Sequence, residues 1–480
     1  MNGLILQAFE WYLPDDGNHF NFLKDNLNKY KDLGFTAIWL PPACKATGTN
    51  DVGYGIYDLY DLGEFDQKGS VRTKYGTRQE LEELISRAHE LGISIYADVV
   101  LNHKAAADEK ETFKAVEVAR DNREHEIGEA HDIEAWTKFT FPGRGDKYSA
   151  FKWTHEHFSG VDYDDKTGKS GIFKILGENK GWSWSVAGEN GNFDYLMFAD
   201  IDHNHPDVRD ELFRWADWFI EEFKIDGFRY DASKHIDAGF MDDLNGHLVN
   251  KHENFYAMAE YWMSDNQSLQ EYMQDTSRKI DLFDVPLHFN MYTAAQSGEN
   301  YDLRRLFDNS IVQTNPSIAV TFVDNHDTQE GQSLQSWVQD WFKEIAYAII
   351  LLRQDGYPTI FFGDMYGIGN DNPYSGIHDQ LIKLLELRRD FAHGQQDDYF
   401  LDPNTIGWVR KGNENHPGSM AVVITNGDAS RITMNVGPDQ AGKVYIDKLG
   451  NNDAEIVIKE DGNGDFFVSP GSVSAWVEKL

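Results

Sequence analysis

The sequence predicts a (β/α)8 TIM barrel with an irregular β-rich insertion after its third strand and a C-terminal antiparallel β-sandwich. Apolar runs of strand length alternate with helical patterns in two stretches, and a segment rich in Trp, Gly, Asp and His separates them. Short alternating strands fill the end of the chain. The expected boundaries are 1–102 and 206–395 for the barrel, 103–205 for the inserted domain and 396–480 for the sandwich.

The first barrel segment contains three expected strands with helical patterns between them. Helical spacing over Phe22–Leu33 ends at Gly34, a residue that commonly stops helices. Thr77 is expected to begin the next helix, because Glu80 three residues later is placed to complete a capping box. The expected strands are Leu4–Trp11, Phe35–Leu40 and Ile93–Val100.

The alternation stops near His103 and resumes at Pro206, a residue that suits the first turn of a helix. Between them we expect short strands such as Gly171–Leu176, with no strong helical period past about residue 120. Asp207–Phe223 is then helical, and Ser333–Arg353 is expected to be the longest helix between the later strands. The remaining barrel strands are expected at Ile225–Ala232, Phe255–Trp262, Leu282–Leu287, Ser317–Asn325 and Tyr357–Asp364.

The last part of the chain changes character after a helix near His378–Phe391. Gly, Asn and Asp turns separate short segments with strand-like alternation, which is typical of an antiparallel sandwich. The expected strands are Thr405–Arg410, Met420–Thr425, Arg431–Val436, Ala454–Glu460 and Val473–Val477.

Composition limits the class of protein and its partners. The 480 residues suffice for two or three domains, and 41% hydrophobic residues indicate a globular chain. The net charge of −36, from 80 acids against 44 Lys and Arg, argues against nucleic acid or an anionic membrane as a partner. A single cysteine, Cys44, excludes an intramolecular disulfide.

The segment after Met1 has no basic stretch followed by an apolar run and a cleavage site, so no signal peptide is expected. The longest clearly apolar run, Ala346–Leu352, is too short to span a bilayer. The simplest interpretation is a soluble, monomeric, cytoplasmic protein. A secreted protein whose signal had been removed is the alternative.

Four acids lie at or just past the ends of expected barrel strands: Asp98, Asp231, Glu260 and Asp327. An unpaired charge is costly to bury, so a buried strand has little use for an acid. For one acid, a buried ion pair with arginine is an equally good explanation. Four acids on four strands, with His103 and His326 nearby, favour chemistry at a shared mouth.

Two carboxyl groups that face each other across a sugar bond can hydrolyse it, one as general acid and the other as nucleophile or base. Arg229 precedes Asp231 by two residues and lies on the same strand face, where its charge favours the ionised carboxylate. Glu260 lies among apolar residues between Ala259 and Tyr261, a setting that raises the pKa of a carboxyl group.

Four motifs carry a resemblance to a known family: Asp98-Val-Val-Leu-Asn-His103, Gly227-Phe-Arg-Tyr-Asp-Ala-Ser-Lys-His235, Ala259-Glu-Tyr-Trp262 and Phe322-Val-Asp-Asn-His-Asp327. In order and spacing they resemble the signature regions of the α-amylase family of retaining glycoside hydrolases, family 13. Five further segments resemble the liquefying bacterial α-amylases, so that the likeness covers nearly the whole chain: Gln7–Tyr12, Gly53–Phe65, Phe141–Gly145, Leu196–Pro206 and Phe361–Tyr366.

The resemblance implies a role for each matching residue. Asp231 would be the nucleophile, Glu260 the acid/base, and Asp327 the residue that stabilises the transition state through sugar hydroxyls. Lys234 and His235 would contact the leaving-group side. The residues implied to hold the sugar at the cleavage point are Asp98, His103, Arg229 and His326. Those implied to stack on glucose rings are Trp11, Tyr54 and Trp262. For these three aromatic residues, plain packing at the barrel rim is the alternative.

The resemblance also implies a structural Ca²⁺ between barrel and insertion, with ligands from Asn102, Asp194, Asp200 and the backbone carbonyl of His235. Such all-oxygen ligation suits a hard cation. Close relatives carry a linked metal cluster with further aspartates, whereas this chain has Ser159, Ser183 and Asn204 at those positions and retains Asp202. We therefore expect one tight Ca²⁺. An acid, Glu330, stands where chloride-dependent members have a basic residue, so chloride activation is not expected.

The expected function is endo-hydrolysis of internal α-1,4-glucosidic bonds in starch, glycogen or maltodextrins, with retention at the anomeric carbon. A transglycosylating enzyme, or one acting on small maltooligosaccharides, is the close alternative on the same scaffold. A non-catalytic carbohydrate-binding or transporter-associated subunit is the alternative from another class. Such a subunit would be expected to lack catalytic acids or to carry a membrane helix, and neither holds for this sequence.

Overall fold

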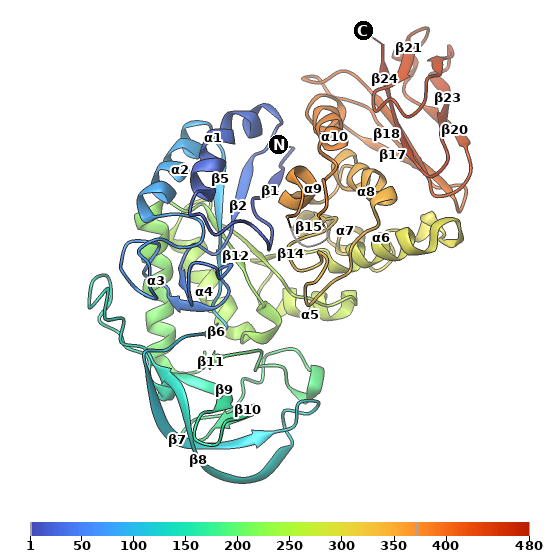
Figure 1. Cartoon of the computed structure of the whole chain (residues 1–480). Coiled ribbons are helices and arrows are strands. Elements are labelled where there is room, and N and C mark those ends of the chain that lie inside the picture. Colours follow the sequence, from blue (N-terminus) through green and yellow to red (C-terminus); the bar gives the residue numbers. More distant parts are fainter. Residues whose placement is uncertain (1, 370–372, 480) are drawn as a thin grey trace.

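The computed structural model describes residues 2–369 and 373–479, and its centre is a closed barrel of eight parallel strands (Figure 1). Neighbouring strands pair in chain order, and β1 pairs with β16 to close the ring. Each of the eight expected strand segments contains or overlaps one barrel strand, so the barrel prediction is confirmed. The strands are β1 (Ile5–Gln7), β2 (Ala37–Leu40), β5 (Ser94–Val99), β12 (Gly227–Tyr230), β13 (Tyr256–Ala259), β14 (Asp281–Phe283), β15 (Ala319–Phe322) and β16 (Tyr357–Phe361).

Helices connect the barrel strands and cover their outer face (Figure 1). The capping box at Thr77 is present, because its backbone N–H donates to the Glu80 carboxylate at 2.8 Å and its side chain accepts from the Glu80 N–H. The main helices are α1 (His19–Asp32), α2 (Arg78–Glu90), α3 (Pro206–Phe223), α4 (Ala238–Lys251), α5 (Asn266–Asp275), α6 (Val285–Ser297), α8 (Asp340–Leu352) and α10 (His378–Phe391), with the shorter α7 (Ile311–Thr314) and α9 (Phe362–Tyr366).

Several expected boundaries are wrong, among them the strand expected to run to Asp364, which ends at Phe361 where α9 begins. The strand expected to run to Leu287 ends at Phe283, because Asp284 caps α6 by accepting the backbone N–H of Leu287 at 3.1 Å. The helix expected from Ser333 begins only at Asp340. The preceding segment is drawn towards the barrel mouth, where the N–H of Val338 donates to Asp324 Oδ2 at 3.2 Å. As a result α8 has 13 residues, and α4, with 14, is the longest helix between the later strands.

The insertion forms a six-stranded sheet that projects from one end of the barrel (Figure 1). Its order is β6-β11-β9-β10-β7-β8, and β10 overlaps the expected strand at Gly171–Leu176. The long hairpin of β7 and β8 is not predicted from the sequence. The strands are β6 (His103–Lys104), β7 (Glu109–Val118), β8 (Glu126–Lys138), β9 (Phe158–Asp164), β10 (Lys169–Ile175) and β11 (Ala199–Ile201), and a short ribbon, β3 (Lys45–Ala46) with β4 (Ile56–Asp58), lies within the first barrel segment.

The C-terminal region contains antiparallel sheets, as expected, with the order β17-β18-β19-β24-β21-β22 and the pair β20-β23. Their facing side chains form a separate core that includes Tyr445, Phe466 and Trp476. β17, β21 and β23 are additional to the expected strands. The strands are β17 (Gln396–Tyr399), β18 (Thr405–Arg410), β19 (Met420–Thr425), β20 (Ser430–Asn435), β21 (Val444–Asp447), β22 (Glu455–Val457), β23 (Asn463–Val468) and β24 (Val473–Glu478).

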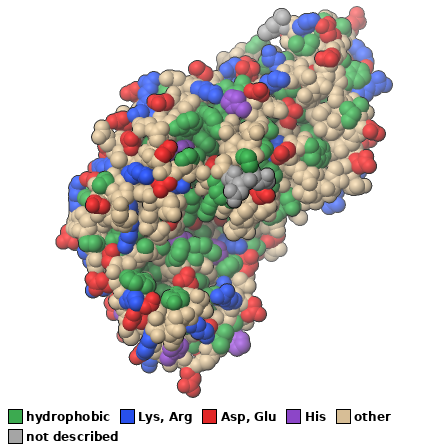
Figure 2. Space-filling model, in the orientation of Figure 1, with side chains coloured by type: hydrophobic (Ala, Val, Ile, Leu, Met, Phe, Trp, Pro, Cys, Tyr) green, Lys and Arg blue, Asp and Glu red, His purple; other side chains and the backbone are tan. Residues whose placement is uncertain are grey.

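Acidic and basic side chains are interspersed over the face shown in Figure 2, which agrees with an ordinary solvated surface. Throughout residues 2–369 and 373–479, no helix has both the length and the apolar character needed to cross a bilayer.

Candidate active site

Arg229 lies at the centre of a group of buried carboxylates at the mouth of the barrel. The β12–β5 register pairs it with Asp98, and its Nη1 donates to Asp98 Oδ1 at 3.0 Å and to Asp231 Oδ1 at 2.6 Å. Its Nη2 donates to Glu260 Oε2. The Arg229 side chain is fully buried, so a single guanidinium provides the nearest positive charge for three acids.

The barrel ladder continues for one residue beyond β12 and β13 and thereby fixes two of these acids. The backbone N–H of Asp231 donates to Val99 O at 3.1 Å, and that of Glu260 donates to Tyr230 O at 3.0 Å. Asp327 lies in the loop after β15, where its N–H donates to Asn325 Oδ1 at 2.8 Å. The expectation that the acids share one mouth is therefore met for strands β5, β12 and β13 and the loop after β15.

Burial raises the pKa of three carboxyl groups at the mouth, those of Glu260, Asp98 and Asp327. Burial raises the pKa of Glu260 to about 7, with further increases from the nearby charges of Asp231 and Asp98 and a decrease from Arg229. Burial likewise raises the pKa of Asp98 to about 6 and that of Asp327 well above its usual range. Glu260 thus has the protonation behaviour of a general acid near neutral pH.

Asp98 is fixed by hydrogen bonds from two aromatic residues. Trp39 Nε1 donates to Asp98 Oδ2 at 3.0 Å, and the Tyr54 hydroxyl donates to the same oxygen at 2.9 Å. Trp39 was missed by sequence reasoning because a tryptophan inside an apolar strand carries no signal beyond packing. His103 joins this group, because its Nε2 lies 2.8 Å from the backbone carbonyl of Tyr54.

His326 and Asp327 are paired at the barrel mouth. His326 Nε2 lies 3.2 Å from Asp327 Oδ2, and its Nδ1 lies 2.9 Å from Gln7 Nε2. An amide NH₂ can only donate, so Gln7 places the imidazole proton on Nε2, facing Asp327. Gln7 was also missed, although a polar residue in the apolar run Leu4–Trp11 was a usable signal.

Two of the three candidate stacking residues line the mouth beside His326. The rings of Tyr54 and His326 are parallel within 3° at 5.2 Å, and those of Trp11 and Tyr54 within 7° at 6.0 Å. Trp262 is half-buried in a different set of contacts, with its ring 5.9 Å from that of His288. Lys234 reaches both Trp262 O, at 3.3 Å, and Glu189 Oε2, at 2.7 Å.

The residues proposed to hold calcium are brought together beside the mouth. Asn102 Nδ2 lies 3.3 Å from Asp200 Oδ1, while Asn102 Oδ1 is buried without a hydrogen-bond partner among the described residues. Burial raises the pKa of both Asp194 and Asp200 well above its usual range, and the nearby charge of Asp202 raises both further. His235 Nδ1 binds the carbonyl of Phe193, next to Asp194, at 2.7 Å. Crowded, buried, oxygen-only donors of this kind fit a Ca²⁺ ion.

A lysine lies beside Asp202, the acid retained from the linked metal cluster that the sequence resemblance implies. Lys180 Nζ forms a buried salt bridge with Asp202 Oδ2 at 2.7 Å and also donates to Phe158 O at 3.2 Å. The hydroxyl of Ser159 donates to Asp200, and that of Ser183 donates to Asp237. The ammonium group therefore supplies positive charge where additional aspartates would have attracted cations.

A second group of metal-binding residue types, not recognised from the sequence, consists of His157, His205 and Asp207, whose ligand atoms lie within 4.8 Å of one another. Calcium disfavours such imidazole-rich sites. The N–H of Thr154 donates to His157 Nδ1 at 2.9 Å, and that of Asp207 donates to His205 Nδ1 at 3.2 Å. Because Nδ1 of each ring accepts a hydrogen bond, a proton on the ring lies on Nε2, which leaves no lone pair there for a metal.

Buried acids around one arginine at the open end of a parallel barrel, flanked by aromatic rings, define a carbohydrate-hydrolysing class of site. The family model "Alpha amylase, catalytic domain" matches residues 20–442, and "Alpha-amylase C-terminal" matches residues 420–477. The chain belongs to the α-amylase family of retaining glycoside hydrolases.

Similar curated proteins extend over the whole chain. An α-amylase of Geobacillus stearothermophilus is 49% identical over 100% of this chain and 87% of its own length. A glucan 1,4-α-maltohexaosidase of Bacillus sp. (strain 707) is 48% identical over 100% and 93%. A cytoplasmic α-amylase of Escherichia coli (strain K12) is 41% identical over 99% of both chains.

The fold also occurs among solved structures. The crystal structure of the α-amylase from Geobacillus thermoleovorans complexed with acarbose superposes with a TM-score of 0.66 at 19% identity, covering 100% of this chain and 98% of that one.

Proposed function

We propose that this chain cleaves internal α-1,4-glucosidic bonds of starch, glycogen and maltodextrins, with Asp231 as nucleophile and Glu260 as acid/base. The observation that carries the proposal is the pair of contacts from Arg229 to both carboxylates at the barrel mouth. Family membership supports the α-glucan substrate and the retaining course of the reaction.

In the first step, Asp231 attacks the anomeric carbon while Glu260 gives its proton to the departing glycosidic oxygen. The C–O bond to the leaving chain breaks as the bond to Asp231 forms, with an oxocarbenium-like transition state between them. The pKa of about 7 supports protonated Glu260 as the acid. Arg229 holds the attacking carboxylate in place through its 2.6 Å hydrogen bond to Asp231.

In the second step, Glu260, now ionised, takes a proton from water, whose oxygen attacks the anomeric carbon and releases Asp231. Two inversions give net retention. Asp327, Asp98, His103 and His326 bind the hydroxyls of the sugar at the cleavage point, and the pairing of His326 with Asp327 at 3.2 Å supports their joint action on one ring.

The neighbouring sugars contact the mouth through other side chains. Trp11 and Tyr54 offer ring surfaces beside His326, and Trp262 offers one beside Lys234. Lys234 and His235 contact the leaving-group side, because they follow Asp231 on the turn after β12.

We propose that one Ca²⁺ binds between barrel and insertion through Asn102, Asp194, Asp200 and the carbonyl of His235. The orphaned Asn102 oxygen and the two buried acids support this assignment. When bound, the ion would cross-link the insertion to the turn that follows Asp231, and it has no part in bond cleavage.

The enzyme is proposed to work as a monomer in the cytoplasm. One chain supplies every residue assigned to the reaction, and the Escherichia coli relative is named a cytoplasmic α-amylase. Sedimentation of the purified protein and fractionation of its native cells test these two statements; an oligomer or an extracellular pool would contradict them.

Product analysis on soluble starch tests the proposed function. The wild type is expected to release α-anomeric oligosaccharides of mixed length with a rapid fall in polymer size, and Asp231→Asn is expected to be inactive. Asp281→Asn is the matched control, because this half-buried acid lies at the start of β14 and accepts a hydrogen bond from Tyr256 at 2.9 Å. Activity retained by Asp231→Asn would overturn the mechanism, and β-anomeric products would overturn retention.

A further inference from the structure

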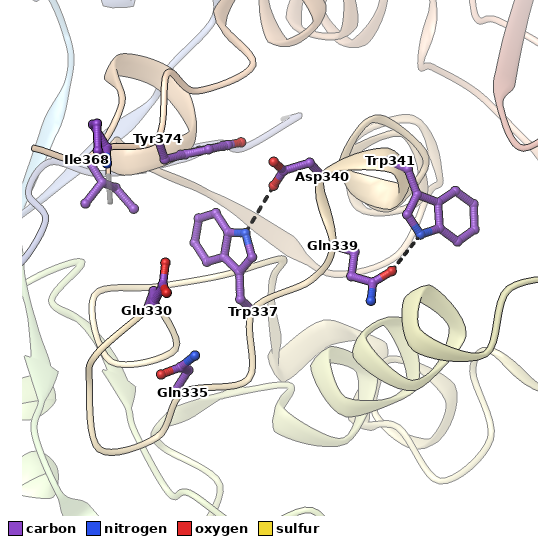
Figure 3. A pocket seen from close by; sticks show the side chains of 9 residues that line it. Glu330, Gln335, Trp337, Gln339, Asp340, Trp341, Ile368 and Tyr374 are labelled. Atoms are coloured by element: carbon purple, nitrogen blue, oxygen red, sulfur yellow. Dashed lines mark hydrogen bonds between the residues drawn. The ribbon is translucent and has the colours of Figure 1, made fainter. Parts of the chain in front are cut away.

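Two pockets of similar volume are lined by none of the acids assigned to the reaction, and they differ in charge. The pocket drawn in Figure 3 has a volume of about 530 Å³, and its lining includes Glu330 and Asp340 but, among the described residues, no Lys, Arg or His. A pocket of about 540 Å³ in the insertion has the opposite character, because two arginines line it, Arg120 and Arg123, against one acid, Asp162. Nothing in the proposed mechanism uses this insertion pocket.

The insertion pocket is formed by three parts of the inserted domain. The turn between β7 and β8 supplies the two arginines, and β9 and β10 supply hydroxyl groups from Tyr163 and Ser170. The segment before β11 supplies Leu196 and Met197. Since β10 pairs with both β7 and β9, the sheet fixes these parts relative to one another. A volume of this size is typical of sites for small ligands.

Arg123 is a buried cation without a counterion among the described residues. It is only 7% exposed, its Nε and Nη1 are buried without a hydrogen-bond partner, and no described acid pairs with it. An unpaired charge is costly to bury. The other buried arginines that the structure describes each donate to a carboxylate or a backbone carbonyl: Arg144, Arg229, Arg388 and Arg410. The exception at Arg123 indicates that a ligand completes its surroundings.

The backbone of Arg123 is held on both sides, so its guanidinium is positioned before any ligand binds. The N–H of Arg123 donates to Asn190 O at 2.8 Å, and its carbonyl accepts from Trp182 Nε1 at 3.0 Å. The guanidinium carbon lies 5.6 Å from the centroid of the Phe193 ring. Such fixation reduces the side-chain entropy that is lost when a ligand binds.

Arg120 adds a second positive charge to the same pocket. It is exposed, and it has no ion pair within the described chain. Burial lowers the pKa of Arg123, and the charge of Arg120 lowers it further, because the two guanidinium groups repel each other. The one acid of the lining is engaged elsewhere, since Asp162 Oδ2 accepts the N–H of Phe198 at 3.1 Å. In a chain with a net charge of −36, two unpaired arginines in one pocket favour an anionic ligand.

The polar and apolar parts of the lining indicate which anion fits. The planar guanidinium matches the oxygens of a phosphate group, and the hydroxyls of Tyr163 and Ser170 can donate to further oxygens. A phosphate ion by itself would fill only part of a volume of about 540 Å³. The apolar side chains of Ile172, Leu196 and Met197 offer a wall on which the organic part of a phosphate ester can pack.

We propose that the pocket of Arg120 and Arg123 is a binding site for a phosphate group, carried by a small monoester such as a phosphorylated sugar or present as free phosphate. The site goes beyond the proposed function, since none of its residues takes part in bond cleavage. The bound anion places negative charge beside the buried guanidinium and joins the β7–β8 turn to β9 and β10. A ligand that binds only the folded chain should also raise Tm.

Calorimetric titration of the full-length protein with glucose 6-phosphate, inorganic phosphate and neutral glucose, at constant ionic strength, tests the site. Arg123→Met removes the buried charge, and Arg120→Gln removes the exposed charge with little effect on folding. Arg431→Gln is the matched control, because Arg431 is exposed on β20 of the C-terminal sheets and has no ion pair with a described acid. Thermal unfolding of the same samples gives the shift in Tm.

We expect the wild type and Arg431→Gln to bind one equivalent of glucose 6-phosphate, and the affinity to fall about tenfold or more in both pocket variants. The response to glucose should be the same in all four proteins. Tighter binding of glucose 6-phosphate than of inorganic phosphate assigns a monoester, and equal binding assigns free phosphate.

Unchanged affinity in both pocket variants would overturn the site, because the signal would then come from another part of the protein, such as the proposed Ca²⁺. An equal loss in Arg431→Gln would overturn it as well. If Arg123→Met does not fold, Arg120→Gln still decides the outcome, since Arg120 is exposed.

Discussion

Arg229 donates through Nη1 to Asp231 at 2.6 Å and through Nη2 to Glu260. The two acids assigned to bond cleavage therefore share one guanidinium. A planar, two-ended cation fixes both carboxylates relative to each other. Arg229 lies two residues before Asp231 in the sequence. This spacing places the guanidinium where it positions both reacting carboxylates.

Arg229→Lys should lower kcat roughly 100-fold or more, because a lysine keeps the charge but cannot hold both acids at once. Steady-state kinetics on soluble starch measures this loss. Arg214→Lys is the control, since the Arg214 side chain is 66% exposed and pairs with Glu211 away from the mouth. A kcat within a few-fold of wild type for Arg229→Lys would contradict the shared-guanidinium account.

The basic limb of the pH profile should report Glu260. The acid must be protonated to act, so kcat/KM is expected to fall as the pH rises through its pKa of about 7. The positive charge of Lys234 lowers the pKa of Glu260, and Lys234→Met should therefore move the basic limb to higher pH. Kinetics over a pH series measure the shift. A limb that stays in place, or moves to lower pH, would show that another group controls it.

The dialysed protein should hold one tightly bound Ca²⁺ per chain, and its removal by a chelator should lower Tm. The salt bridge of Lys180 with Asp202 at 2.7 Å supplies positive charge beside Asp202, which disfavours a further cation there. Metal analysis with thermal unfolding tests this expectation. Two or three tightly held ions would contradict it, as would full thermal stability after complete removal of the metal.

Lys343 should position the loop that carries Asp327. It donates to Asp324 at 2.6 Å, and Asp324 Oδ1 accepts from Thr328 Oγ1 at 2.7 Å, immediately after Asp327. Lys343→Met leaves two buried acids without their cation, which should destabilise the fold by about 3–5 kcal/mol and lower kcat.

Thermal unfolding together with kcat at a temperature where the variant is folded measures both effects of Lys343→Met. Lys279→Met is the control, because its pair with Asp242 is partly exposed and should contribute less than about 1 kcal/mol. A variant with reduced stability but wild-type kcat would leave Lys343 a structural role only.

The barrel was predictable because its strands are short apolar runs whose ends carry unusual polar residues. Local rules also sufficed for the capping box at Thr77 and for the helix His378–Phe391, whose bounds agree with the sequence prediction. The hairpin of the insertion was not predictable in the same way. The first seven residues of β8, from Glu126, are all exposed, so there is no alternation of buried and exposed positions to detect.

Tertiary contacts determine the features that the sequence left open. Leu282–Leu287 is apolar except for Asp284, and the cap that Asp284 forms divides the segment into a strand and a helix. The four acids were predictable from their places at strand ends. Trp39, which donates to Asp98, and Lys343, which donates to Asp324 in the segment before Asp327, come from other elements and are identified only when the barrel brings them together.

The most direct test of the central claim is to trap the covalent intermediate on the protein. A fluorinated maltosyl fluoride that forms the intermediate quickly and releases it slowly is incubated with the enzyme, which is then digested with a protease and analysed by mass spectrometry. The account predicts one glycosyl group per active chain, esterified to the carboxylate of Asp231. A label on Glu260 or Asp327, or turnover of the reagent with inversion at the anomeric carbon, would contradict it.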